Sequence, residues 1–144
     1  MRKIYRNFIN KKEVELLESD VNSLFNKINV GDNKIIDRIL SQLKEDFDFN
    51  IKEQSYYLIE HIPKGHEWHR DTGINNHMPW CNIGVSLLIK EPLSGGDMYY
   101  ADDNKETNKI KVERNLYDLV AHTSNEWHMV EPHEGERKVF LMFI

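Results

Sequence analysis

Residues 82–101 read NIGVSLLIKEPLSGGDMYYA, two short apolar segments separated by a stretch rich in turn-forming residues. Each apolar segment has the length of a strand, and the intervening EPLSGG contains the proline and glycines that favour turns. Similar segments lie on both sides of this stretch, namely SYYLIEHI, GHEWHRD, NLYDLVAH, EWHMVEP and ERKVFLMFI. We therefore predict seven short strands between residues 55 and 144.

The first third of the chain has a helical periodicity instead. Asn10 followed by Glu13 forms a capping box, which predicts the start of a helix. Gly31 ends this helix, and Asp32 or Asn33 can cap a second one. The apolar stripes of the two helices are Val14, Leu17, Val21, Leu24, Phe25 and Ile28, and Ile36, Ile39, Leu40, Leu43 and Phe47. We expect both helices to pack on a sheet and assign them no chemistry.

Helices followed by many short antiparallel strands predict an α+β fold in a single domain, residues 1–144. Residues 1–50 form its helical N-terminal part, and residues 55–144 form a β sandwich or barrel. The net charge is −5 and the basic residues are scattered, which disfavours nucleic acid as a partner. Cys81 is the single cysteine, and no segment approaches the roughly 20 apolar residues of a membrane span, so we expect a cytoplasmic protein.

The segment GHEWHRDTG places His69 and Asp71 two residues apart. In a strand such residues point to the same face, so an imidazole and a carboxylate can reach one ion. His128, in the late strand EWHMVEP, can complete a facial triad of two histidines and one carboxylate, which is typical of non-haem Fe(II) oxygenases. His-x-Asp alone is weak evidence and also suits a surface strand. His66 is the best rival ligand, although its spacing of three from His69 turns its ring away.

Trp68 and Trp127 directly precede the two histidines. By alternation they face the other side of their strands, where we expect them to pack against the helices.

The C-terminal segment HMVEPHEGERKVFLMFI strengthens the metal hypothesis. Its pattern of His-x-Val-x-Pro, an Arg or Lys nine or ten residues after the histidine, and a final apolar strand resembles the prolyl 4-hydroxylase branch of the Fe(II)/2-oxoglutarate oxygenases. Gly65, four residues before His69, and the glycine turn at residues 94–96 agree in order and spacing. The resemblance covers roughly residues 55–144 and implies a double-stranded β-helix, or jelly roll, with the N-terminal helices packed on one sheet.

The resemblance also implies the cofactors. Fe(II) would be held by His69, Asp71 and His128, with 2-oxoglutarate as cosubstrate, O₂ as oxidant, and room for a role of ascorbate. The far carboxylate of 2-oxoglutarate needs a cation, for which Arg137 is preferred over Lys138 because a guanidinium grips a carboxylate with two parallel hydrogen bonds. A tyrosine common in relatives falls on Ile59 here, and Tyr57, two residues earlier on the same strand face, is the candidate substitute.

The predicted function is hydroxylation of a peptide or protein side chain, with proline as the leading candidate and succinate and CO₂ as coproducts. The substrate follows from the resemblance alone. Hydroxylation of a small molecule or free amino acid is the alternative within the enzyme class. A non-catalytic jelly-roll binding module that retains a metal is the alternative outside it. Demethylation of nucleic acid is disfavoured by the acidic charge.

Overall fold

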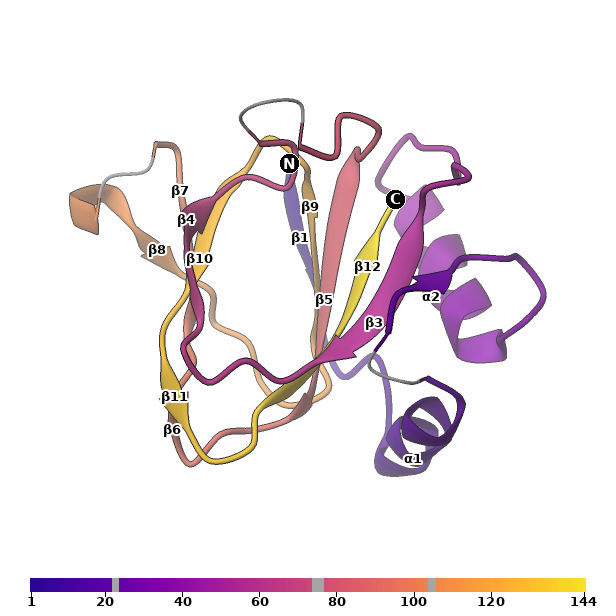
Figure 1. The fold of residues 1–144 in the computed structure, drawn as a ribbon, viewed down its shortest axis with the longest axis horizontal. Coiled ribbons are helices and arrows are strands. Elements are labelled where there is room, and N and C mark those ends of the chain that lie inside the picture. The colour runs from indigo at the N-terminus through magenta and orange to yellow at the C-terminus, as the bar shows by residue number, and fades with distance from the viewer. Residues whose placement is uncertain (22–23, 74–76, 104–105) are drawn as a thin grey trace.

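Two β-sheets face each other, and two helices cover the outer side of one of them (Figure 1). The computed structural model describes residues 1–21, 24–73, 77–103 and 106–144. The elements are β1 (Arg2–Tyr5), α1 (Lys11–Asp20), β2 (Asn26–Lys27), α2 (Lys34–Lys44), β3 (Tyr56–Glu60), β4 (His66–His69), β5 (Ile83–Lys90), β6 (Ser94–Gly95), β7 (Met98–Ala101), the 3-10 helix Glu106–Asn108, β8 (Ile110–Lys111), β9 (Leu119–Thr123), β10 (Trp127–Val130), β11 (His133–Glu134) and β12 (Lys138–Phe143).

The larger sheet has the strand order β1-β9-β5-β12-β3-β2, and the smaller sheet has the order β4-β10-β7-β8. All pairings in both sheets are antiparallel. From β3 onward the chain crosses repeatedly between the sheets, because β3, β5, β9 and β12 belong to the larger one and β4, β7 and β10 to the smaller one. β11 and β6 form a separate two-stranded sheet, which lies below the smaller sheet at the lower left of Figure 1.

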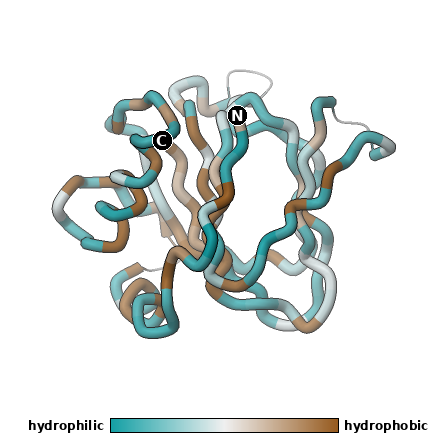
Figure 2. Tube along the Cα trace, turned by 180° about the vertical axis from the view of Figure 1, so that it is seen from behind, coloured by the Kyte–Doolittle hydropathy of each residue, from teal (hydrophilic) through white to brown (hydrophobic). Residues whose placement is uncertain are grey.

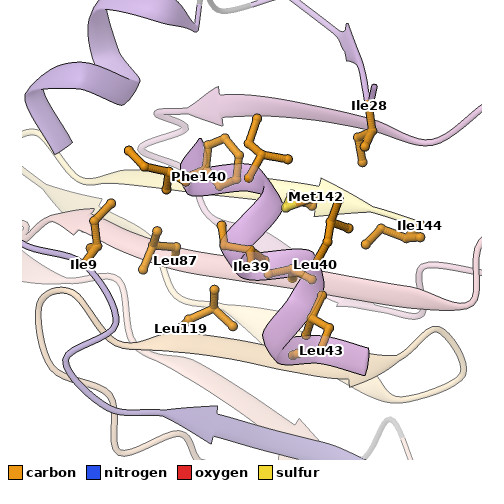
Figure 3. Close-up of a cluster of buried hydrophobic side chains, with 14 of the residues drawn as sticks. Ile9, Ile28, Ile39, Leu40, Leu43, Leu87, Leu119, Phe140, Met142 and Ile144 are labelled. Atoms are coloured by element: carbon orange, nitrogen blue, oxygen red, sulfur yellow. The ribbon is translucent and has the colours of Figure 1, made fainter. Parts of the chain in front are cut away.

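The main hydrophobic core lies between the helices and the larger sheet. Ile39, Leu40 and Leu43 of α2 point onto the strands in Figure 3, where they meet Leu87 of β5 and Phe140 of β12. The apolar colouring in Figure 2 is concentrated on these strands and helices, whereas the connecting loops are mainly hydrophilic. The inner face of the larger sheet is left free of this core and faces the smaller sheet.

The seven predicted strands are confirmed as β3, β4, β5, β7, β9, β10 and β12. The capping box of α1 is confirmed by the bonds between Asn10 and Glu13, and Asn33 caps α2 by accepting from Ile35 N and Ile36 N. Residues 1–50 are nevertheless not all helical, because they also contain β1 and β2. β1 pairs with β9, a partner more than 100 residues away that local periodicity cannot reveal.

The expected extent of the first helix was wrong. The helix ends at Asp20, whereas Leu24 and Phe25 of the predicted apolar stripe are 69% and 74% exposed. Part of the predicted continuation, residues 22–23, lies outside the described residues. β2 follows at Asn26 and adds an edge strand to β3, so tertiary pairing replaces the helical repeat there.

The expected packing of the two tryptophans on the helices was also wrong. They belong to β4 and β10 of the smaller sheet, whereas the helices cover the larger one. Trp68 donates its indole N–H to Glu106 Oε1 at 2.6 Å, and the Arg70 guanidinium lies 4.8 Å above the Trp127 ring. No helix among the described residues is long and apolar enough to cross a membrane.

Candidate metal centre and adjoining pocket

The structure brings together the side chains of His69, Asp71 and His128. His69 is the last residue of β4, and the antiparallel register places His128 of β10 directly opposite it. Asp71 follows β4 by two residues and turns its carboxylate toward both rings. One ligand atom from each residue lies within 4.8 Å of the other two. Asp71 Oδ1 is 3.3 Å from His128 Nε2 and 4.0 Å from His69 Nε2.

The tautomer of each neutral imidazole follows from its backbone contact. His69 Nδ1 donates to the carbonyl oxygen of Glu67 at 2.7 Å, and His128 Nδ1 donates to that of Glu126 at 2.9 Å. In each neutral ring the Nε2 atom then carries a lone pair. Burial, followed by the neighbouring His128 ring, lowers the pKa of His69, which favours this neutral form.

Three electron-pair donors therefore converge without a proton between them. Burial would raise the pKa of Asp71, but the hydrogen bond that His122 donates lowers it, which keeps the carboxylate ionised. The ionised carboxylate and two neutral imidazoles suit a divalent transition metal. His69 retains 41% side-chain exposure, which leaves one side of the cluster open. Three ligands with open positions are typical of a catalytic centre rather than a closed structural site.

A second pair of residues, His122 and Tyr100, orients the Asp71 carboxylate. His122 of β9 donates Nε2–H to Asp71 Oδ2 at 2.7 Å, and its Nδ1 accepts from the Tyr100 hydroxyl at 2.8 Å. Burial raises the pKa of Tyr100, so the phenol keeps the proton that this chain of bonds requires. No pattern in the sequence pointed to His122 as part of the site. Its contact with Asp71 spans 51 residues, so no local pattern signals it.

Gly84 of β5 makes the approach of Asp71 and His122 sterically feasible. A Cβ atom on Gly84 would lie 2.1 Å from Asp71 Oδ2 and 2.6 Å from His122 Nε2. Real Cβ atoms essentially never come that close to another heavy atom. The observed arrangement of Asp71 and His122 therefore requires glycine at position 84.

A pocket of about 90 Å³ extends from this cluster between the sheets. Along β12, Val139, Leu141 and Phe143 line it, and Arg137 lies just before that strand. Phe143 pairs with Gly84 near the cluster, whereas Val139 pairs with Leu88 four residues further along β5. Four residues of strand span about 13 Å, so Arg137 lies well away from the cluster, toward the other end of the pocket.

Arg137 is 5% exposed, and within the described parts of the chain its guanidinium has neither an ion pair nor a hydrogen bond. Burial lowers the pKa of this group. His61 Nδ1 donates to the Arg137 carbonyl oxygen at 2.8 Å and so holds the backbone. Gly96, with φ of +76°, leaves space for the side chain, because a Cβ there would lie 2.7 Å from Arg137 Cδ. The result is a buried cation that lines a pocket and has no ion pair with any carboxylate in the described part of the chain.

Lys138 faces the other way, as strand alternation requires. Its ammonium lies 3.2 Å from Glu136 and 3.5 Å from Glu18 of α1, on the helix side of the sheet. Lys138 does not line the pocket. The structure thus places Arg137, and not Lys138, in the pocket that extends from His69, Asp71 and His128.

The structure does not bring Tyr57 to this pocket. Its ring lies against Phe140, with centroids 5.6 Å apart, and packs with Ile59 against the helix-side core. The inward residue at this end of β3 is Glu60, which lines the pocket and accepts from His66 Nε2 at 2.6 Å. Tyr57 and Ile59 do share a face, as predicted, but that face belongs to the helices. His66, the rival ligand, is occupied by Glu60.

The fold of this chain is found in other proteins of known structure. No protein-family model matches the sequence, and no curated protein sequence matches it. Solved structures do match, and they include prolyl 4-hydroxylases and a member of the 2OG-Fe(II) oxygenase family. A prolyl-4-hydroxylase from Pseudomonas putida is 16% identical with a TM-score of 0.71, and the alignment covers 99% of this chain and 83% of that one.

Two further solved structures have a similar fold. A 2OG-Fe(II) oxygenase family oxidoreductase from Burkholderia pseudomallei is 11% identical with a TM-score of 0.66, covering 99% of this chain and 82% of that one. EvdO2 from Micromonospora carbonacea, complexed with 2-oxoglutarate, is 13% identical with a TM-score of 0.68, covering 99% and 84%. At these identities the likeness establishes a shared fold over nearly the whole chain.

Proposed function

We propose that the protein is an Fe(II)- and 2-oxoglutarate-dependent dioxygenase that hydroxylates a side chain of a peptide or protein. The observation that carries this proposal is one pocket with three converging metal-ligand atoms near one end and an unpaired, buried guanidinium toward the other. 2-Oxoglutarate has a metal-chelating keto acid at one end and a carboxylate at the other. Its two ends match the two ends of the pocket.

The chain route supports the finer description of the fold as a double-stranded β-helix. Strands that are consecutive from β3 to β5 alternate between the larger and smaller sheets, and β9, β10 and β12 do so again. Such alternation winds a ribbon into a jelly roll with the pocket in its interior.

Each residue has a distinct role in this proposal. His69, Asp71 and His128 would hold Fe(II), with His122 orienting Asp71, and Arg137 would bind the far carboxylate of 2-oxoglutarate. The apolar walls of β12 exclude water around the cosubstrate. When bound, iron and 2-oxoglutarate supply oxidative decarboxylation to succinate and CO₂ coupled to hydroxylation of the substrate by O₂.

Proline is the proposed target residue. It is supported by the C-terminal sequence pattern and by the structural likeness to a prolyl-4-hydroxylase. Hydroxylation of a small molecule or free amino acid remains the alternative within the same chemistry.

Production of succinate from 2-oxoglutarate tests the proposal most directly. The Fe(II)-loaded protein should convert 2-oxoglutarate to succinate in the presence of O₂, and a proline-containing peptide library should gain the mass of one oxygen. Succinate without any modified peptide would favour a small-molecule substrate. A protein that binds Fe(II) but forms no succinate under any condition would be a metal-retaining binding module.

Arg137→Ala should raise the dissociation constant of 2-oxoglutarate at least about tenfold, since the charged hydrogen bonds it removes are worth roughly 2–5 kcal/mol. Iron affinity should change little, because the arginine lies far from the ligands. Anaerobic titration of the Fe(II) protein with 2-oxoglutarate, followed by the metal-to-ligand charge-transfer absorbance, measures the dissociation constant, and iron retained after desalting measures iron binding. Lys138→Ala is the matched control, since it removes the adjacent cation from the other face. If Lys138→Ala had the larger effect, Arg137 would not be the anchor.

A further inference from the structure

A second guanidinium, that of Arg114, lies next to the proposed cosubstrate site. Arg114 lies between β8 and β9, and its Nη1 donates to Ser86 Oγ at 2.8 Å and to the Ser86 carbonyl oxygen at 3.1 Å. Ser86 is on the inward face of β5 and lines the pocket that leads to the metal cluster. The arginine therefore reaches across the space between the sheets and is held there by two hydrogen bonds.

Arg114 and Arg137 line one further pocket, of about 280 Å³, together with Leu88, Met98 and Val112. Arg137 lines both this pocket and the one that leads to the metal cluster, so it joins the two spaces. Burial, followed by the nearby positive charge of Arg137, lowers the pKa of Arg114 to about 10. The two cations thus repel each other across a partly buried space.

The surrounding carboxylates do not neutralise this pair. Among the described residues, neither arginine takes part in an ion pair. The three carboxylates whose charges act on these arginines each contact another residue. Glu60 lies 2.6 Å from His66, Asp97 lies 3.4 Å from Lys111, and Asp118 lies 2.8 Å from Arg6. Glu91 also lines the larger pocket but is solvent-exposed. A buried guanidinium beside a half-buried one is unfavourable unless an anion lies between them.

We propose that Arg114 and Arg137 together bind the far carboxylate of the cosubstrate, with Ser86 positioning Arg114. This inference rests on the proposed function and adds a second anchoring residue to it. Two guanidinium groups offer a carboxylate more than one parallel pair of charged hydrogen bonds. Two guanidinium groups also keep this end of the pocket positive although Glu60 lines the same pocket. The pair should therefore select dicarboxylic over monocarboxylic keto acids.

Calorimetric titration of the Mn(II)-loaded full chain tests this inference with two ligands. Arg114→Gln should weaken binding of 2-oxoglutarate by about tenfold or more, the loss expected for hydrogen bonds to a charged group. Binding of 2-oxobutyrate, which has no far carboxylate, should be unchanged. Ser86→Ala should produce a smaller loss for 2-oxoglutarate only, because the carbonyl of residue 86 still holds Arg114. Arg114→Lys should fall between wild type and Arg114→Gln.

Lys90→Gln is the matched control, since it removes one positive charge from the same end of β5 without lining either pocket. Equal weakening of both keto acids in Arg114→Gln, or no weakening of either, would overturn the inference. A wild-type protein that binds Mn(II) but not 2-oxoglutarate would instead overturn the proposed function and the inference with it. Thermal unfolding of each variant shows whether a loss of binding reflects a loss of fold.

Discussion

Replacing His69, Asp71 or His128 by alanine should abolish iron binding at stoichiometric concentrations. Each substitution deletes one of only three protein ligands, and loss of a residue that merely supports a ligand already costs about 10–100-fold in affinity. Asp71→Ala should have the largest effect, because it also removes the negative charge and leaves His122 Nε2 without its acceptor. Iron retained after anaerobic loading and desalting measures the outcome for each variant.

His66→Ala is the control for these variants. The His66 ring lies 5.8 Å from that of His69, but its Nε2 bonds to Glu60 and its ligand atoms do not join the cluster. It should load iron almost normally. A variant of His69, Asp71 or His128 with wild-type iron content would remove that residue from the proposed ligand set, and loss of iron in His66→Ala would point to a different set.

Gly84→Ala should disable the centre without altering any ligand. The new methyl group would require Asp71 Oδ2 and His122 Nε2 to move from positions only 2.1 Å and 2.6 Å away. β5 cannot shift to relieve the clash, because it is paired with β12 on one side and β9 on the other. We expect the carboxylate to be displaced, iron to be lost, and the free energy of unfolding to fall by about 1–3 kcal/mol, as for other overpacked sites.

Gly73→Ala provides the comparison for Gly84→Ala. It is the same substitution close to the same loop, but its Cβ would come no nearer than 3.4 Å to a neighbouring atom, the Cβ of His77. Iron content and urea unfolding of the two variants should therefore differ clearly. Normal iron loading in Gly84→Ala would mean that Asp71 can bind the metal from another position, and the hydrogen bond from His122 would not be required.

The convergence of His69, Asp71 and His128 was predictable because the relevant signals are local or have fixed spacing. His69 and Asp71 share a face by strand alternation, and the C-terminal pattern beginning at His128 resembles a known family over a short segment. The alternation within ERKVFLMFI also separates Arg137 from Lys138. It could not say which face is inward, because both faces of β12 are apolar, one toward the helices and one toward the pocket.

Tyr57 also shows that strand alternation does not tell which face is inward. Alternation correctly grouped it with Ile59, but the choice of face depends on where the helices lie, and they cover that side of β3. Glu60, which the sequence did not suggest, takes the inward position.

By itself, the sequence determined where the strands lie, which residues share a strand face, and that two histidines and an aspartate could hold a metal. Only the tertiary structure decided which face is inward and which distant residues meet there. His122 reaches Asp71, and Arg114 reaches Ser86, through sheet registers and strand crossovers that join positions 28 to 51 residues apart. The physical reason is that side-chain periodicity is a property of one strand, whereas contact across a pocket depends on how two sheets close around it.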